Sequence, residues 1–470
     1  MACIRAIGRY STPMLSERLL SKTIGAGAVQ LFKAKTATAD VLPGPQPGHT
    51  YMLYVHVPFC DVLCPYCSFT RFPFKEELGR RYFKALRTEL KRIHDLGYQP
   101  PSAYIGGGTP TIMMDELERT IDYMRELFPT IQEVSSETNP PHLDRERLER
   151  LSHMVQRFSV GVQSFDNTLL KRMDRYNKYG SAEEIVERIQ SVHDMFQTFN
   201  VDMIFNLPGQ TPEMILHDID VFKTTGANQI TYYPLMASPG SEKLMQTCFH
   251  GQVDYKLERE LYNTIFDTMT APVNEGGAGF YATDVYTFAK DRNAMIDEYV
   301  VDYGEFVAAG CGGYSFMGSE IYNNDSSLDG YCRRIEEGHM SVSSKIDMGK
   351  ANEKRYRMGR ELFGLRLNNR QWRQDYGKYI QYDLPVEYGY LAANGAFDKN
   401  NADELTLTRK GRYLVLVMMR QIFIGMNTER DRLRTLLPDQ ERKMFSDSAE
   451  KQIAAARAAD EADEAATAAK

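Results

Sequence analysis

The sequence is most informative at Met52-Leu-Tyr-Val-His-Val-Pro-Phe-Cys60-Asp-Val-Leu-Cys64-Pro-Tyr-Cys67, where a short β-rich run leads into three cysteines. Residues 52–57 predict a strand. The cysteines that follow have the spacing C-x-x-x-C-x-x-C, and the other four cysteines of the chain are scattered. A cubane iron–sulfur cluster normally takes four cysteine ligands, and a structural zinc site needs four Cys or His ligands. Three thiolates therefore indicate a metal with a position left for a ligand from outside the protein.

Two other interpretations of the cysteines are possible. His56 could complete a zinc site, although it lies on the predicted strand and Pro58 stiffens the path to Cys60. The pair Cys64-Pro-Tyr-Cys67 could be a redox dithiol, because such pairs carry thiols of lowered pKa. The redox interpretation leaves Cys60 unexplained, so an iron–sulfur centre is favoured.

Length and composition describe a globular protein with ordinary cores. The 470 residues suffice for two or three domains. The net charge of -7 gives no general attraction for nucleic acid, so no nucleic-acid partner is expected. Seven cysteines, an odd number without paired spacing, favour a reducing compartment over a disulfide scaffold.

No segment is expected to span a membrane. The longest apolar run, residues 413–426, is interrupted by Arg420 and is shorter than the roughly 20 residues that a transmembrane helix needs. The first forty residues contain one acid, Glu17, before Asp40, which is also typical of a mitochondrial transit peptide. A helix over 14–33 with a proline-rich lead-in explains this composition equally well. The cytoplasm is the favoured location.

Between residues 51 and 239, short β-rich runs alternate with longer amphipathic ones, which is typical of βαβ units and a parallel sheet. A helix is predicted over 83–96 after the cysteines. Right-handed crossovers would curl the strands into a full or partial barrel, with the strand ends meeting at one face where active sites form. Each polar or glycine-rich motif directly follows a strand. The predicted strands are 52–57, 102–105, 133–137, 156–162, 201–205 and 229–233, with further strands in 280–289 and 306–316.

The whole chain divides into five parts on this pattern. The barrel core is followed by a region that completes the barrel and lines the substrate side, and then by a small, mainly helical cap domain. The last segment is rich in alanine and charged residues and shows no apolar stripe, so it is expected to be frayed or disordered. The parts are an N-terminal extension and lead-in (1–50), the core (51–240), the completing region (241–345), the cap (350–435) and the tail (441–470).

Five motifs together resemble the radical S-adenosylmethionine superfamily. Within it, they are similar to the branch that contains oxygen-independent coproporphyrinogen III oxidase, a heme chaperone and an anaerobic heme-degrading methyltransferase. The resemblance covers residues 51–315. The motifs are Tyr54-x-His-x-Pro-Phe-Cys60-x-x-x-Cys64-x-x-Cys67, Gly106-Gly-Gly-Thr-Pro110, Glu137-x-Asn-Pro140, Ser159-x-Gly-x-Gln163-Ser-Phe165 and Asp202-x-Ile-x-x-Leu-Pro-Gly-Gln-Thr211.

The resemblance implies a 4Fe-4S cluster on Cys60, Cys64 and Cys67, whose remaining iron chelates S-adenosylmethionine. One electron, from a donor such as flavodoxin or ferredoxin, then cleaves the sulfonium and yields a 5'-deoxyadenosyl radical. Tyr54 is expected beside the cluster as a catalytic and cofactor-binding residue. Other implied contacts to S-adenosylmethionine come from Gly107, Gly108, Thr109, Glu137, Gln163, Arg175 and Asp202.

Two departures from the oxidase pattern concern the substrate. Phe69 stands where the oxidase has a further cysteine, and Thr287 stands where a histidine is expected before Phe288-Ala289. The first hypothesis is a radical enzyme acting on a tetrapyrrole, similar to the oxidase of anaerobic heme biosynthesis. The alternatives are a heme chaperone, the heme-degrading methyltransferase, and a radical enzyme with an unrelated substrate.

Overall fold

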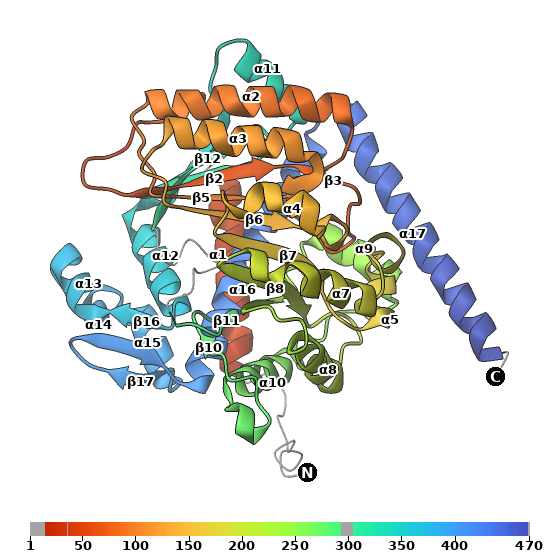
Figure 1. The fold of residues 1–470 in the computed structure, drawn as a ribbon. Coiled ribbons are helices and arrows are strands. Elements are labelled where there is room, and N and C mark those ends of the chain that lie inside the picture. Colours follow the sequence, from red (N-terminus) through yellow and green to blue (C-terminus); the bar gives the residue numbers. More distant parts are fainter. Residues whose placement is uncertain (1–14, 35, 293–303, 469–470) are drawn as a thin grey trace.

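A computed structural model of the chain describes residues 15–34, 36–292 and 304–468 (Figure 1). At its centre lies a 13-stranded sheet whose seven middle strands are all parallel. This arrangement confirms the predicted α/β class. In spatial order the parallel strands are β12 (Glu305–Ala309), β2 (Tyr51–Val57), β5 (Ser102–Gly107), β6 (Glu133–Thr138), β7 (Arg157–Gln163), β8 (Thr198–Phe205) and β9 (Gln229–Pro234).

Antiparallel strands extend the sheet at both edges. No pairing between described residues joins the two outermost strands, so the sheet is a partial barrel. Strand β12 pairs with β2, which means that a strand from the predicted completing region adds to the beginning of the barrel. Beyond β12 lie β13 (Tyr314–Met317), β14 (Glu320–Asn324), β15 (Val342–Asp347) and β1 (Thr36–Thr38), and beyond β9 lie β11 (Thr287–Ala289) and β10 (Tyr281–Ala282).

Helices on the outside of the sheet bury one apolar face each. Helix α2 places Phe83, Leu86 and Leu90 in the core, and it begins at Glu76, seven residues before the predicted start. Acidic residues in its first turn suit the positive end of the helix dipole. The helices that connect the strands of the main sheet are α2 (Glu76–Asp95), α3 (Met114–Leu127), α4 (Arg145–Ser152), α5 (Asn167–Arg172), α6 (Tyr176–Tyr179), α7 (Ala182–Val192), α8 (Pro212–Phe222), α9 (Pro239–Phe249), α10 (Glu258–Thr270) and α11 (Leu328–Glu336).

Short elements connect these helices and strands. The pair β3 (Phe59–Cys60) and β4 (Phe72–Pro73) closes the cysteine segment, and the single-turn helices are η2 (Pro110–Met113), η3 (Pro140–His142), η4 (His193–Met195) and η5 (Val273–Glu275).

The predicted C-terminal cap contains a small sheet as well as helices. Strands β16 (Arg366–Asn368), β18 (Glu404–Leu407) and β17 (Phe397–Asn400) form a separate antiparallel sheet. The expectation of a mainly helical unit holds, but this sheet was missed because its strands are only three or four residues long. Its helices are α12 (Gly349–Phe363), α13 (Asn369–Tyr376), α14 (Ile380–Asp383), α15 (Pro385–Ala393) and α16 (Arg409–Thr435).

Helix α16 returns from the C-terminal unit to the main body and packs along α1 (Leu15–Ala34) (Figure 1). The two helices approach closely at small residues. A side chain at Gly425 would place its Cβ 2.7 Å from the Cβ of Ala28. The predicted N-terminal helix is therefore confirmed, and it is part of the core of the molecule. The predicted N-terminal extension before residue 15, and residues 293–303 of the completing region, lie outside the described residues.

The tail was expected to be frayed or disordered, and in the structure it is helical. It forms α17 (Asp439–Ala468), which lies along the outside of the molecule next to α9 and α5 (Figure 1). The buried stripe of this helix uses Glu441, Phe445, Gln452 and Ala456, spaced by four, seven and four residues. Polar and small residues make up most of this stripe, which is why no apolar periodicity was visible in the sequence.

Among the described residues, no helix combines the length and the apolar character that crossing a membrane requires.

Candidate functional site

The three cysteines lie on a closed loop directly after β2, as the sequence predicted. The loop is held at its base by the Phe72 N–H, which donates to the Pro58 carbonyl at 2.6 Å, and by the Phe74 N–H, which donates to the Cys60 carbonyl at 3.0 Å. Cys60 and Cys64 are buried and Cys67 is half-buried, and all three are free thiols. Burial raises the pKa of the Cys60 thiol to about 12. A cationic centre would favour the thiolate form of Cys60.

Three thiols on one loop are compatible with a cluster in which each thiolate binds a different iron. Within the described residues, no group of three or more His, Cys, Asp or Glu side chains gathers closely enough to hold a single metal ion. A cubane does not need such a compact set, because each thiolate binds a different iron. Three free thiols on one loop therefore fit a cubane.

His56 fixes the loop instead of supplying a fourth ligand. Its Nε2 donates to the Thr70 carbonyl at 2.7 Å, and its Nδ1 accepts from the Tyr54 hydroxyl at 2.9 Å. Burial lowers the pKa of His56 to about 4, so the ring is neutral at physiological pH. Both ring nitrogens thus form hydrogen bonds. The Tyr54 hydroxyl is therefore linked to the cysteine loop through His56.

Two buried arginines bring positive charge to the cysteines. Arg71 donates to the Cys64 carbonyl at 2.6 Å; burial disfavours its charge, but the three cysteines together raise its pKa. Arg175 donates to the Cys64 sulfur at 3.5 Å and to the Tyr66 hydroxyl at 3.2 Å. Its guanidinium also lies 4.3 Å from the Tyr179 ring centre.

Each of these arginines keeps a buried Nε–H without a hydrogen-bond partner in the structure. Such an orphaned donor is costly in a protein interior. The two guanidinium groups therefore suit an anionic group beside the thiols, as a thiolate-bound cluster or a cofactor carboxylate would provide. The sequence predicted this environment for Arg175 and missed Arg71, although Arg71 is the only basic residue close after the last cysteine.

The glycine motif is packed against other parts of the site. A Cβ at Gly107 would lie 2.4 Å from the His56 ring, and one at Gly108 would lie 2.4 Å from the Phe59 carbonyl oxygen. Thr109 continues this contact, because its N–H donates to the Phe59 carbonyl at 2.7 Å. The glycines thus let β5 and the cysteine loop touch, in addition to any role in approaching a cofactor.

Glu137 and Gln163 lie at the ends of β6 and β7, as expected, whereas Asp202 lies within the neighbouring strand β8, three residues before that strand ends. Glu137 accepts from the Gly107 N–H at 3.0 Å and from the Tyr104 hydroxyl at 2.8 Å, so it is tied to the glycine motif. Gln163 has a φ of 78°, in a region that favours glycine, at an irregularity between β7 and β8. Strain of this kind in a non-glycine residue often accompanies a functional position.

Asp202 lies on β8, three strands away from the glycine motif on β5. It accepts from the Ser159 hydroxyl at 2.8 Å and from the Asn200 side-chain amide at 2.7 Å, and it stands opposite Gly161 in the strand register. Arg175 closes the row by donating to the Gly161 carbonyl and, at 3.1 Å, to the Asn139 side chain. The structure therefore places the predicted residues in a row across neighbouring parallel strands, while their roles toward a cofactor stay predictions.

The glycine turn at 310–313 forms another wall of the site. A Cβ at Gly310 would lie 2.5 Å from the His56 carbonyl oxygen, and one at Gly312 would lie 2.6 Å from Thr70. The turn is held from outside, because the Gly310 N–H donates to buried Glu89 at 2.7 Å. Cys311 is buried within it as a packing residue.

Comparison with known proteins identifies this arrangement. A family model described as the radical SAM superfamily matches residues 54–222, which contain the cysteine loop and every predicted contact to S-adenosylmethionine. These residues therefore form a radical SAM domain. The chain is similar to proteins named heme chaperone HemW, and it shares its fold with coproporphyrinogen III oxidase.

Two relatives and one solved structure illustrate this relationship. Heme chaperone HemW of Bacillus subtilis is 26% identical over 378 residues, which are 77% of this chain and 96% of that relative. HemW of Lactococcus lactis is 32% identical over 187 residues, which are 39% of this chain and 48% of the relative. Coproporphyrinogen III oxidase (HemN) from Escherichia coli shares the fold with a TM-score of 0.65, at 20% identity, over 88% of this chain and 96% of that one.

Proposed function

We propose that the protein is a heme-binding chaperone of the radical SAM type, with a 4Fe-4S cluster on Cys60, Cys64 and Cys67. One observation carries the proposal: the similarity to a protein named as a heme chaperone extends over 96% of that relative's length. The first hypothesis from the sequence is an oxidase-like enzyme. The named relatives support the alternative, a heme chaperone, better. Phe69, where the oxidase has a further cysteine, points the same way.

The residues of the chain fit the cluster and S-adenosylmethionine in three respects. The three thiols are available on one loop, the guanidiniums of Arg71 and Arg175 lie beside them, and Glu137 and Asp202 offer carboxylates on the parallel strands β6 and β8. When bound, the cluster supplies one electron for cleavage of S-adenosylmethionine. The chain itself binds and orients the groups, and the buried arginines stabilise negative charge at the thiolates.

A second candidate is radical chemistry on a tetrapyrrole, either oxidative decarboxylation or methyl transfer. It is favoured by the complete set of predicted cofactor contacts, since Tyr54, Glu137, Gln163, Arg175 and Asp202 all occur. A protein that only carried heme would have no chemical use for them. This candidate would also require a one-electron donor such as flavodoxin or ferredoxin.

Anaerobic reconstitution separates the two candidates. We expect the reconstituted protein to show the absorption of a cubane, to bind heme with a Soret shift, and to return the heme unchanged by mass. Vinyl formation from coproporphyrinogen III, or an opened and methylated ring from heme, would instead support the second candidate.

The cluster ligands have a matched control. Cys64→Ala should lower bound iron and sulfide at least severalfold, whereas Cys248→Ala should retain both because Cys248 is buried in α9 far along the chain. Equal iron loss in the two variants, or stoichiometric zinc without sulfide in the wild type, would contradict the proposed cluster.

A further inference from the structure

The C-terminal end of α16 brings arginines to the cysteine loop, although 366 residues separate Ser68 and Arg434 in the chain. The guanidinium carbon of Arg430 lies 5.0 Å from the ring centre of Phe69 and 5.2 Å from that of Tyr314. Arg434 donates to the Ser68 carbonyl at 3.5 Å. These two arginines thus face the residues that directly follow the third cysteine.

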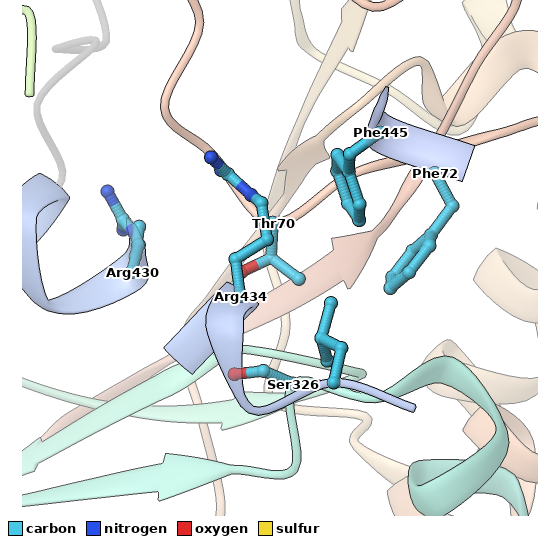
Figure 2. Close-up of a pocket in the computed structure, with 7 residues that line it drawn as sticks. Thr70, Phe72, Ser326, Arg430, Arg434 and Phe445 are labelled. Atoms are coloured by element: carbon cyan, nitrogen blue, oxygen red, sulfur yellow. The ribbon is translucent and has the colours of Figure 1, made fainter. Parts of the chain in front are cut away.

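A small pocket lies between this helix end and the loop (Figure 2). In the figure the side chains of Arg430 and Arg434 extend to the same side, and Thr70 is another of the residues that line the pocket. Hydroxyl groups and guanidiniums on one wall face aromatic carbon on another. The residues that line the pocket are Thr70, Phe72, Ser326, Arg430, Arg434, Leu437 and Phe445.

Positive charge in this pocket is only partly compensated. Arg430 donates to the Asn427 side chain at 2.8 Å, and no carboxylate among the described residues forms an ion pair with it. Arg434 pairs with Asp431 at 2.8 Å, but that carboxylate also accepts from the Gly240 N–H. Burial lowers the pKa of Arg434, and the nearby charge of Arg71 lowers it further.

Other carboxylates on the helix are engaged elsewhere. Glu429 accepts two hydrogen bonds from Arg432, at 2.6 and 2.8 Å. The helix end therefore carries a surplus of guanidinium groups toward the cysteine loop. An added carboxylate would gain charge-assisted hydrogen bonds there, because guanidinium geometry matches a carboxylate in a bidentate manner.

An exposed aromatic ring adjoins the pocket. Phe69 is 48% exposed, although a phenylalanine is normally buried, and it lies beneath Arg430. A flat apolar ring could therefore cover Phe69 while a carboxylate on its edge reached the arginines. Heme and coproporphyrinogen combine these two features, because each is a large ring system with propionate side chains.

We propose that Arg430 and Arg434, with the Thr70 hydroxyl, bind a propionate carboxylate of the tetrapyrrole and orient its ring beside the cysteine loop. This inference rests on the proposed function, because it names how heme would be held at the same site.

The test is an anaerobic heme titration of the reconstituted full chain, followed by the Soret band. Arg430→Gln and Arg430→Gln/Arg434→Gln should weaken heme binding by roughly tenfold or more, as expected for lost charge-assisted hydrogen bonds. Arg430→Lys should restore part of the affinity. Arg432→Gln is the matched control, because Arg432 lies on the same helix and pairs with Glu429.

Heme dimethyl ester, in which both propionates are esterified, provides the second arm. The diester should bind the wild type more weakly than heme does. The arginine variants should bind the diester with the same affinity as the wild type. The carboxylate of S-adenosylmethionine is the other possible source of negative charge, so its affinity is measured in parallel and should stay unchanged. Iron content and the thermal midpoint establish that the variants are folded and loaded.

Three results would overturn the inference while leaving the proposed function intact. In the first, the arginine variants bind heme as tightly as the wild type does. In the second, the wild type binds heme and its diester with equal affinity. In the third, the variants lose affinity for S-adenosylmethionine only. Failure of the wild type to bind any tetrapyrrole would instead refute the proposed function, and the inference would fall with it.

Discussion

At the scale of single residues, buried polar side chains support the candidate site by hydrogen bonding to the segments that carry it. Asp218 is an example: it is fully buried in α8, and it accepts from the Phe165 N–H at 2.6 Å and from the Ser164 hydroxyl at 3.1 Å. These partners directly follow Gln163, the strained residue at the end of β7. Asp218 thereby fixes a segment of the strand-end row from behind.

Asp218 also predicts a pH dependence of stability. Burial raises its pKa to about 8 in the folded protein, well above the ordinary value for an aspartate of about 3.9. Between these two values the unfolded chain releases the proton and the folded chain keeps it, so the contribution of Asp218 to stability falls as pH rises from about 4 to about 8.

Asp218→Asn should remove this dependence. The thermal midpoint of the wild type minus that of the variant should decrease steadily from pH 5 to pH 8. Asp220→Asn is the control, since Asp220 lies on the same helix, is exposed, and pairs with Lys223 at the surface. A difference that stays constant with pH would contradict the assignment.

At the scale of elements, the local patterns were predicted well and the partners of each element were not. The parallel strands and their polar ends could be predicted because β-rich runs, glycines and the cysteine spacing are all local features of the sequence. Arg71 and the hydrogen-bonding of His56 also lie in the motif, yet their contacts depend on how the loop folds back on β2. Arg430 could not be predicted as part of the site, because its helix reaches the loop only through tertiary packing.

Helix α17 is the element that the sequence described least well. Phe445 packs on Phe72 with ring centres 5.5 Å apart, and Phe72 belongs to the short strand that closes the cysteine loop. Glu441 accepts from the Ser327 hydroxyl at 3.2 Å and from the Asp329 N–H at 2.9 Å, at the beginning of α11. The tail therefore supports both the loop and a helix of the sheet edge.

Phe445→Ala should lower the free energy of unfolding by about 1 to 3 kcal/mol, since the ring is half-buried and a fully buried phenylalanine costs about 3 to 5 kcal/mol. It should also shorten the time for which the reconstituted protein retains its iron, because the loop loses its outer support. Lys443→Ala, at an exposed position of the same helix, is the control for denaturant unfolding and for iron release. Indistinguishable behaviour of the two variants would show that α17 does not support the loop.

At the scale of the whole molecule, the C-terminal unit is joined to the barrel by a buried ion pair. Arg420 of α16 donates to Glu258 of α10, and both side chains are almost fully buried. The Tyr413 hydroxyl also donates to Glu258 at 3.0 Å, and the Arg420 guanidinium lies 4.4 Å from the Tyr255 ring centre. Arg420 is the residue that interrupts the longest apolar run of the sequence, and this contact explains why a charge occurs there.

Glu258→Gln should lower the free energy of unfolding by about 3 to 5 kcal/mol, because it leaves the Arg420 charge buried without its partner. Glu258→Gln combined with Arg420→Met should recover much of this loss, since no unpaired charge then remains. Glu260→Gln, two residues along α10, should change stability by less than about 0.5 kcal/mol. Denaturant titration measures all three, and a double variant less stable than the single one would contradict the argument.

The contact between α1 and α16 has a consequence for how the protein is made. Residues 15–34 are synthesised well before their packing partner at residues 409–435. Strand β2 likewise waits for β12, about 250 residues later in the chain, before its outer edge is paired. The apolar side of α1 and one edge of the central sheet must therefore remain uncovered until these later segments are made, and such uncovered surfaces are prone to aggregate. A nascent chain that stops before residue 409 should for this reason bind holding chaperones and load no cluster, even though it already contains every cysteine of the metal site.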